Sequence, residues 1–263
     1  MLLEFEVFEE EIDKTIYGNT KSKLLNKIAT SPDRYIGLFR TTSPKMKLMQ
    51  NLTQSHEISF GDFVENIITM YFGLFYKNLP KKANYKNELI LFDQLFIYEN
   101  TIYMIEQKIR DDHDSTKKRG QFVNFVKKIK YLQQEYPTNK ISASMWFVDN
   151  SLMKNKRYYL NMMETEKAKL QVELNLFYGD ELFIYLDQMS IWDEMITYLF
   201  EWKQKVDNDI DLNFEKDWEE TKKEIYEFVS KGNWEKLLNN NKVVDQIFPI
   251  LFPTERFKEI YYD

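Results

Sequence analysis

The spacing of apolar residues along the chain changes from a helical period to a strand period. Over Phe60–Tyr76 the apolar positions recur every three or four residues, which predicts an amphipathic helix. The next apolar segments, Leu89–Tyr98 and Thr101–Ile109, are instead rich in β-branched and aromatic residues. Only Glu99 and Asn100 separate them, so the two segments predict an antiparallel hairpin with a two-residue turn.

Helical and extended patterns alternate after the hairpin. Ser115 or Thr116 can cap a helix whose apolar face begins at Phe122. Ile141–Val148 and Leu174–Tyr178 are expected to be strands. Three further helices are expected at Ile191–Val206, Phe214–Lys231 and Trp234–Asn239. This order predicts an α/β fold in which helices flank a mixed sheet, with an additional helical C-terminal region.

Composition limits the chemistry that this chain can carry. The 263 residues include no cysteine and only two histidines, His56 and His113, which excludes a disulfide framework and a thiolate or histidine-rich zinc site. A metal would therefore be held by oxygen atoms, which favours Mg²⁺ or Mn²⁺. No G-x-x-x-x-G-K-[ST] loop is present to bind nucleotide phosphates.

Charge is distributed unevenly along the chain. The formal net charge is −6, but residues 1–160 carry 24 basic against 19 acidic residues, a net of +5, and residues 161–263 carry 12 against 23, a net of −11. The first part suits a polyanion better than the last. The N-terminus is acidic where a signal peptide would be basic, and no apolar stretch is long enough to cross a membrane, so a cytoplasmic protein without a membrane partner is expected.

The hairpin turn fixes which side chains lie opposite each other. With a two-residue turn, Tyr98 pairs with Thr101 and each pair of positions sums to 199, which places Asp93 opposite Glu106. Side chains alternate along a strand, so Lys108 shares the face of Glu106 and Gln107 points away. Two carboxylates and one amine are thus expected at one end of the hairpin. They could hold a divalent cation, or they could form an ordinary solvated ion pair.

Two observations bear on this choice. The Glu-x-Lys pattern recurs at Glu201 and Glu220, but only the copy at Glu106 lies in a strand opposite an aspartate. Directly opposed like charges destabilise a sheet unless something compensates them. Replacing Asp93 or Glu106 is therefore expected to leave the stability of the fold near its original value, because the lost contacts are offset by relief of repulsion.

Asp93, followed on the next strand by Glu106-Gln107-Lys108, resembles the core motif of the PD-(D/E)XK nucleases. The stretch EQKIRDDHDSTKKRGQ resembles small type II restriction endonucleases in particular. The resemblance implies a restriction-endonuclease-like core in which Asp93, Glu106 and the main-chain carbonyl of Gln107 ligate Mg²⁺, with Mn²⁺ as a substitute. It implies that Lys108 positions or polarises the attacking water, and that Glu65 on the preceding helix is an accessory acid. Phe92 stands where the motif has proline.

Basic residues after the motif are candidates for binding DNA. Lys117, Lys118 and Arg119 fall in the first turn of the expected helix, where they could hold backbone phosphates or simply face solvent. Gln121 follows them and could orient Lys108 or complete the packing. Ser151–Tyr159 has the composition of a DNA-facing loop, and its candidate contacts are Lys154, Lys156 and Arg157.

The sequence therefore predicts a magnesium-dependent, sequence-specific endonuclease acting on double-stranded DNA. Its expected parts are an N-terminal segment with DNA-recognition elements (1–55), the nuclease core (56–187) and an acidic helical C-terminal region (188–263). A cognate DNA methyltransferase is the expected functional partner, and a palindromic target would favour a homodimer. The alternatives are a structure-specific or repair nuclease on the same core and a non-catalytic DNA-binding protein.

Overall fold

The computed structural model describes residues 1–206 and 210–262. The chain forms two compact units, each made of two stretches of sequence. The sheet unit comprises Met1–Phe8 and Val64–Gln204, and the helical unit comprises Glu9–Phe63 and Lys205–Asp263. The helical unit is thus built from segments near both ends of the chain. The separate roles expected for residues 1–55 and 188–263 stay predictions.

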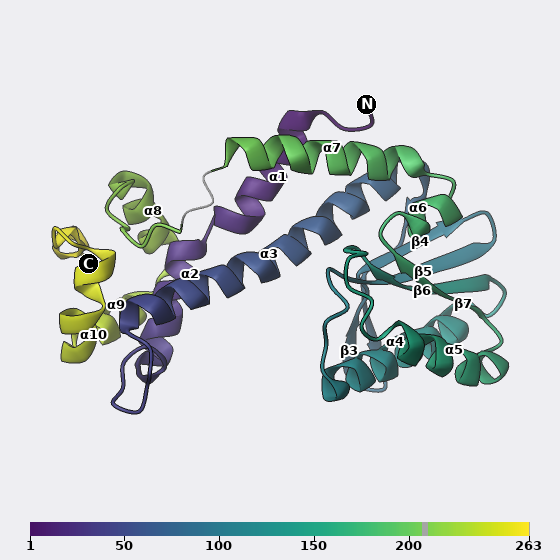
Figure 1. The fold of residues 1–263 in the computed structure, drawn as a ribbon, viewed down its shortest axis with the longest axis horizontal. Helices are drawn as coiled ribbons and strands as arrows, with labels where there is room; N and C mark the ends of the chain where they lie inside the picture. Colours follow the sequence, from purple (N-terminus) through teal and green to yellow (C-terminus); the bar gives the residue numbers. More distant parts are fainter. Residues whose placement is uncertain (207–209, 263) are drawn as a thin grey trace. The chain divides into compact units, whose positions relative to one another are not determined.

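A five-stranded mixed sheet forms the centre of the sheet unit (Figure 1). Its strand order is β1-β4-β5-β6-β7, in which β1 and β4 are antiparallel to their neighbours while β5, β6 and β7 run parallel. The strands are β1 (Lys77–Asn78), β4 (Gln94–Tyr98), β5 (Thr101–Lys108), β6 (Lys140–Phe147) and β7 (Glu173–Tyr178). The expected α/β fold with a mixed sheet is therefore confirmed.

The hairpin has the expected register but a shorter first strand. Tyr98 pairs with Thr101 and Gln94 with Ile105, so paired positions sum to 199 as predicted. The segment Leu89–Tyr98 is, however, two strands in two sheets. β3 (Glu88–Leu91) pairs with β2 (Lys82–Tyr85) in a separate two-stranded sheet, and β4 begins at Gln94. The prediction of one continuous strand was wrong because Phe92 and Asp93 interrupt it: the N–H of Phe92 still donates to the carbonyl of Lys81 beside the β2–β3 sheet, and its side chain is buried at the junction.

Two helices cover one face of the sheet. They are α4 (Ser115–Glu135) and α5 (Lys156–Leu170), which lie together on one side in Figure 1. Their apolar side chains pack on Ile102 and Met104 of β5. Helix α4 is capped by Asp114, whose carboxylate accepts from the N–H of Lys117 at 2.8 Å, and not by Ser115 or Thr116 as expected.

Helix α5 was not predicted. The segment Ser151–Tyr159 was expected to be a loop, but it contains the first turn of α5. Strands β6 and β7 are parallel, and parallel neighbours need a crossover connection, which is usually a helix. Its buried residues are few, Tyr159, Met163 and Leu170, and a mostly polar run separates the last two, so little in the sequence indicated the helix.

The opposite face of the sheet is covered by residues 64–75 of α3 (Pro44–Phe75) and by α6 (Glu181–Tyr185), and α7 (Met189–Lys205) packs against these two helices. The ring of Phe72 on α3 lies 4.9 Å from that of Phe96 on β4, and Phe183 on α6 lies 5.4 Å from Trp146 on β6. Helix α3 is longer than the Phe60–Tyr76 prediction because it begins at Pro44, a residue well suited to the first position of a helix.

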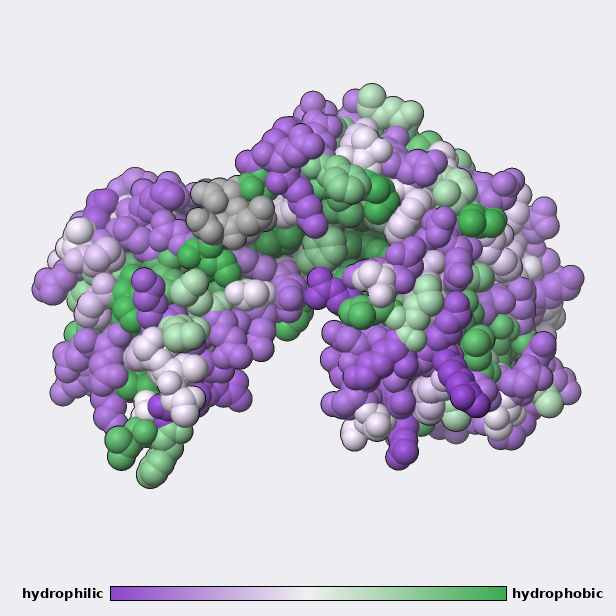
Figure 2. Space-filling view, in the orientation of Figure 1, coloured by the Kyte–Doolittle hydropathy of each residue, from purple (hydrophilic) through white to green (hydrophobic). Residues whose placement is uncertain are grey.

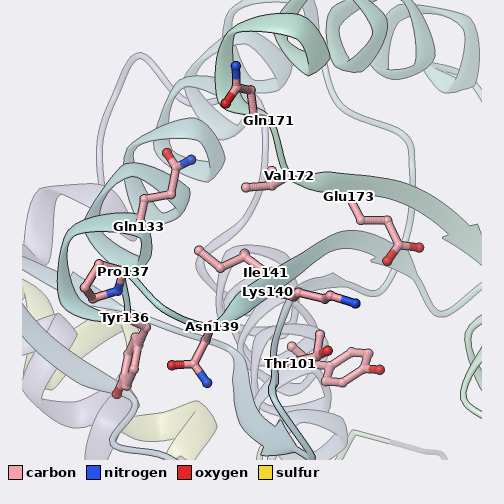
Figure 3. A pocket seen from close by; sticks show the side chains of 11 residues that line it. Thr101, Gln133, Tyr136, Pro137, Asn139, Lys140, Ile141, Gln171, Val172 and Glu173 are labelled. Carbon is pink, nitrogen blue, oxygen red and sulfur yellow. The ribbon is translucent and has the colours of Figure 1, made fainter.

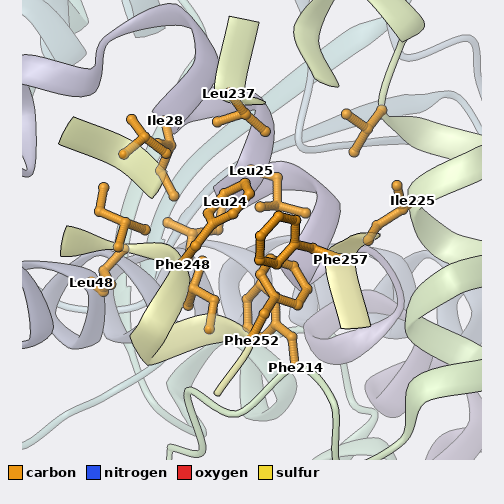
Figure 4. Close-up of a cluster of buried hydrophobic side chains, with 14 of the residues drawn as sticks. Leu24, Leu25, Ile28, Leu48, Phe214, Ile225, Leu237, Phe248, Phe252 and Phe257 are labelled. Atoms are coloured by element: carbon orange, nitrogen blue, oxygen red, sulfur yellow. The ribbon is translucent and has the colours of Figure 1, made fainter. Parts of the chain in front are cut away.

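The helical unit has its own apolar core (Figure 4). Leu24, Leu25 and Ile28 of α2 (Thr20–Thr30) pack against Phe248, Phe252 and Phe257 near the C-terminus. The unit also contains part of α1 (Phe5–Tyr17) and the helices and 3-10 turns η1 (Pro32–Arg34), α8 (Trp218–Phe228), α9 (Lys231–Leu238), α10 (Asn241–Gln246), α11 (Phe248–Leu251) and η2 (Arg256–Glu259). In the part of the chain that the structure describes, no helix is both long and apolar enough to cross a bilayer.

Candidate active site

Asp93 lies where the chain passes from the small β2–β3 sheet to the main sheet. Its Oδ2 accepts from the main-chain N–H of Gln107 and from the ammonium of Lys108, each at 2.8 Å. The first of these bonds ties Asp93 to the end of β5. The ladder of the hairpin ends at Gln94, so Asp93 is not paired with Glu106 as the register predicts, and its hydrogen bonds instead hold it beside Gln107 and Lys108.

Glu106 and Lys108 end strand β5 on the face covered by α4. Glu106 is 6% exposed, and its Oε1 lies 3.1 Å from the Nζ of Lys108. The same Nζ donates to Asp93 Oδ2 and, at 2.5 Å, to the main-chain carbonyl of Gln107. Three oxygen atoms from Asp93, Glu106 and Gln107 thus converge on a single cationic group.

The carboxylates determine the protonation of Lys108. Burial alone would lower the pKa of this lysine, but the charges of Glu106 and Asp93, together with hydrogen bonds to both, more than offset burial and raise the pKa above its ordinary value. Lys108 is therefore an ammonium at neutral pH. It can stabilise negative charge or orient a water molecule, but it cannot accept a proton in this arrangement.

Gln107 points to the other face of the sheet, as the alternation predicts. Its Oε1 accepts from Gln94 at 3.4 Å, and Gln94 also donates to the main-chain carbonyl of Glu65 on α3 at 2.8 Å. The carboxylate of Glu65 forms an ion pair with Lys81. Glu65 therefore lies on the face of the sheet opposite to Glu106, where its carboxylate pairs with Lys81.

Lys128 of α4 was missed by the sequence reasoning. Its ammonium forms an ion pair with Glu106 Oε2, and the two side chains are 11% and 8% exposed. Its position in the sequence could have indicated that it is buried and paired. Lys128 falls on the apolar face of the helix between Phe125 and Leu132, where a lysine is buried only if a partner compensates its charge.

The basic residues predicted to contact DNA gather at the beginnings of α4 and α5. Lys117 and Arg119 are exposed. Lys118 donates to Asn155 at 3.0 Å and lies 4.7 Å from the ring centre of Tyr158, so it links the two helices.

The three basic residues predicted around α5 occupy different surroundings. Lys154 donates to the main-chain carbonyl of Asp112 at 3.2 Å, Lys156 lies 5.1 Å from the ring centre of Tyr178, and Arg157 is exposed. Gln121 accepts from the hydroxyl of Tyr159 at 2.9 Å, which supports the packing role expected as one of its two alternatives.

A buried aspartate holds these two helix starts together. Asp111 is fully buried and accepts from the N–H of Asn155 at 2.7 Å, from its side-chain amide at 2.8 Å and from the hydroxyl of Tyr178 at 3.0 Å. A buried carboxylate needs such donors to offset its lost hydration. Asp111 was not singled out in the sequence because two further acidic residues, Asp112 and Asp114, follow it and obscure it.

His113, in the same loop, is more buried than its polar surroundings suggested. Its side chain is 12% exposed, and its Nε2 is buried without a hydrogen-bond partner. Burial is the main cause that lowers the pKa of His113, and the charge of Lys117 adds to it. The imidazole is therefore neutral at pH 7.

A pocket of about 650 Å³ lies at the other end of the sheet (Figure 3). Its lining includes Thr101 and Lys140, the first residues of β5 and β6, whereas Glu106 and Lys108 end β5. Polar groups of this lining are engaged within the protein: Gln133 donates to a main-chain carbonyl and Glu173 accepts from Tyr185. The pocket is thus separate from the cluster of Asp93, Glu106 and Lys108.

The mixed sheet with flanking helices defines a restriction-endonuclease-like core. The sequence matches the family described as "Type II restriction endonuclease, HinfI" over residues 6–88 and 72–203. The chain belongs to this family of type II restriction endonucleases.

Other comparisons add little. No curated protein matches the sequence. Among solved structures, the chain is similar to Can2 from Sulfobacillus thermosulfidooxidans in complex with cyclic tetra-adenylate, with 14% identity and a TM-score of 0.30. The match covers 74% of this chain and 53% of that one, so the chain spans about half the length of Can2. A TM-score this low supports no conclusion about fold or function.

Proposed function

We propose that this restriction endonuclease hydrolyses double-stranded DNA at one short sequence and that Asp93, Glu106 and the carbonyl of Gln107 hold the Mg²⁺ that it needs. The observation that carries the proposal is the convergence of their three oxygens on the Lys108 ammonium, at 2.8, 3.1 and 2.5 Å. Oxygen atoms that together surround one cationic group form a set suited to a hard cation.

The donor set fits magnesium better than a metal that needs a complete protein cage. Among residues 1–206 and 210–262, no group of three or more His, Cys, Asp or Glu side chains could hold a metal ion. Mg²⁺ is commonly held by one or two carboxylates and completes its coordination with water and substrate phosphate. Two carboxylates and one carbonyl meet this requirement, and Mn²⁺ would be accepted by the same ligands.

The residues have distinct roles in the proposed reaction. A bound Mg²⁺ would stabilise charge on the phosphate oxygens and lower the pKa of a water molecule. Lys108, kept protonated by the two carboxylates, would orient the attacking water and stabilise the negative charge that develops on the phosphate. Glu65 is proposed as an accessory acid beneath this end of the sheet, held in place by Lys81.

The beginnings of α4 and α5 are proposed to bind the DNA backbone. The exposed side chains of Lys117, Arg119 and Arg157 are free to reach phosphates, while Lys118, Lys154 and Lys156 already contact neighbouring groups of the protein. Gln121 lies beside them on α4. A basic side chain in the first turn of a helix is disfavoured by the helix dipole, so the placement of Lys117 to Arg119 is better explained by a polyanionic partner.

The N-terminal segment (1–55) is proposed to contribute to sequence recognition. The loop between η1 and α3 exposes Leu38 by 91% and Phe39 by 100%, while Tyr35 and Ile36 at its base are buried. Figure 2 shows the hydrophobic tip of this loop projecting from the helical unit. Arg40, Lys45 and Lys47 follow the tip, and an apolar tip with basic neighbours suits contact with DNA bases.

A restriction role implies partners and a cellular setting. We propose a cognate DNA methyltransferase that protects the host sequence, a homodimer if the target is palindromic, and action in the cytoplasm, where both the host and the invading DNA are present. A methyl group in the major groove blocks a hydrogen bond or a close approach to the base edge. Methylation would therefore prevent cleavage without changing the enzyme.

One cleavage experiment tests the proposal. Purified protein is incubated with unmethylated phage DNA and Mg²⁺, and the ends of the products are sequenced. Discrete fragments that share one short motif are expected. Random or junction-directed breaks would indicate a structure-specific or repair nuclease, and no cleavage with Mg²⁺ or Mn²⁺ on several DNAs would indicate a non-catalytic DNA-binding protein.

A further inference from the structure

Lys128 occupies a position that the packing of α4 reserves for apolar residues. Phe122, Phe125, Ile129 and Leu132 on the same face of the helix are buried in the core beneath the sheet. Lys128 is itself only 9% exposed. Burying an ammonium group is costly unless a partner compensates its charge. The carboxylate of Glu106 is that partner.

The contacts of Lys128 reach both sides of the candidate metal site. Its ammonium forms an ion pair with Glu106 Oε2 and lies 5.9 Å from the ring centre of Phe92. Phe92 is buried and directly precedes Asp93. The buried Lys128 ammonium therefore contacts one proposed metal ligand, Glu106, and also Phe92, the residue that precedes the second proposed ligand, Asp93.

The two oxygens of Glu106 are divided between two lysines. Oε1 lies 3.1 Å from Lys108, and Oε2 pairs with Lys128. The Lys108 side chain is 27% exposed and the Lys128 side chain 11%, so Oε1 faces the more accessible side and Oε2 the interior. A cation arriving from solvent would compete with Lys108 for Oε1 and would leave the Lys128 pair intact.

We propose that Lys128 is a positioning residue for the nuclease reaction. It holds Oε2 so that Glu106 presents Oε1 to the metal, and its charge weakens the attraction of the site for a divalent cation before DNA is bound. This inference rests on the proposed function, in which Asp93 and Glu106 ligate the metal.

The charge of Lys128 predicts an effect that an ordinary structural ion pair does not. A carboxylate that supports a ligand histidine strengthens metal binding, but a cation paired with a ligand carboxylate draws negative charge away from it. Removing Lys128 should therefore raise the affinity for metal while it lowers turnover. Loss of a merely structural contact would lower both or change neither.

The test combines metal binding without DNA and cleavage with DNA, using the full chain. Mn²⁺ is titrated into the DNA-free protein and the free ion is followed by electron paramagnetic resonance. Lys128→Met is expected to bind Mn²⁺ about ten-fold more tightly, the effect of one positive charge on a divalent ion roughly 6 Å away even at the dielectric constant of water. Its turnover on unmethylated phage DNA at saturating Mg²⁺ should fall by about 10- to 100-fold.

Two further variants serve as controls. Lys128→Arg retains the charge and should keep the original Mn²⁺ affinity and most of the turnover. Lys130→Met removes a lysine from the exposed side of the same helix and should change neither quantity. If Lys128→Met does not fold, Lys128→Gln, which keeps a hydrogen-bond donor for Glu106, gives the same two measurements.

Unchanged or weaker Mn²⁺ binding in the neutral variants, or unchanged turnover, would overturn the role of Lys128. Asp93→Ala separates this result from failure of the proposed function. If Asp93→Ala binds Mn²⁺ as tightly as the original protein, the metal site itself is assigned wrongly. If Asp93→Ala loses Mn²⁺ while the Lys128 variants behave as the original protein, only the role of Lys128 is wrong.

Discussion

The buried ion pair between Glu106 and Lys128 makes the stability of the fold depend on a proposed catalytic residue. Sequence reasoning expected that replacing Glu106 would cost little, because it would relieve repulsion between two opposed carboxylates. The structure replaces that expectation, since both carboxylates are already compensated: Asp93 by Lys108, and Glu106 by Lys108 and Lys128. Glu106→Leu would leave the Lys128 ammonium buried without a carboxylate.

The size of the expected loss of folding free energy follows from the burial of the two side chains. The Glu106 and Lys128 side chains are 8% and 11% exposed, and removing one partner of such a pair costs about 3–5 kcal/mol. Lys128→Met should cost less, about 1.5–3 kcal/mol, because Glu106 keeps Lys108 as a partner. The double variant replaces the pair with two apolar side chains and should recover much of the loss, which gives a coupling energy of at least about 2 kcal/mol.

Equilibrium unfolding in urea, followed by circular dichroism, measures the four free energies of this cycle. A second cycle with Glu88→Leu and Lys127→Met is the matched control. That pair joins β3 to the same helix α4, but Glu88 is 68% exposed, so its coupling should stay below about 1 kcal/mol. The reasoning is refuted if the Glu106–Lys128 coupling is no larger than that of the surface pair.

Three further predictions concern chemistry, DNA binding and pH. Lys108→Ala should lower turnover far more than DNA affinity, because its role is in the transition state; an equal loss of affinity, measured with Ca²⁺ in place of Mg²⁺, would make it a binding residue. Changing exposed Lys117 and Arg119 to alanine should lower the slope of log DNA affinity against log salt concentration by about two. Lys118→Ala should change this slope less, because the Lys118 ammonium already bonds Asn155. If none of these variants changes the slope, the three residues do not contact DNA phosphates. Burial lowers the pKa of both His113 and His56, so the unfolded chain takes up protons first and stability should fall as the pH drops below about 6.5, by up to about 1.4 kcal/mol per pH unit for each histidine. His113→Gln and His56→Gln should each reduce that pH dependence in urea unfolding between about pH 7 and 5.5, and an unchanged dependence would contradict the assignment.

Local pattern was sufficient for the central part of the site. The two polar residues of the Glu99–Asn100 turn fix the register of the hairpin, and strand alternation then places Glu106 and Lys108 on one face and Gln107 on the other. These are relations between residues close in sequence, for which spacing determines geometry. The strands β6 and β7 were predicted for the same reason, because their apolar runs are short and bounded by polar residues.

Tertiary structure decided what compensates the charges of the site. Lys128 is 22 residues from Glu106 along the chain, and only the packing of α4 on the sheet brings the two together. The same is true of Asp111 and Asn155, which lie 44 residues apart and join the beginnings of α4 and α5. It also paired the two ends of the chain in the helical unit, where α2 packs against residues near the C-terminus. Sequence patterns report the face on which a side chain lies, but the partner across that face depends on how separate elements pack, and apolar packing surfaces fit more than one arrangement.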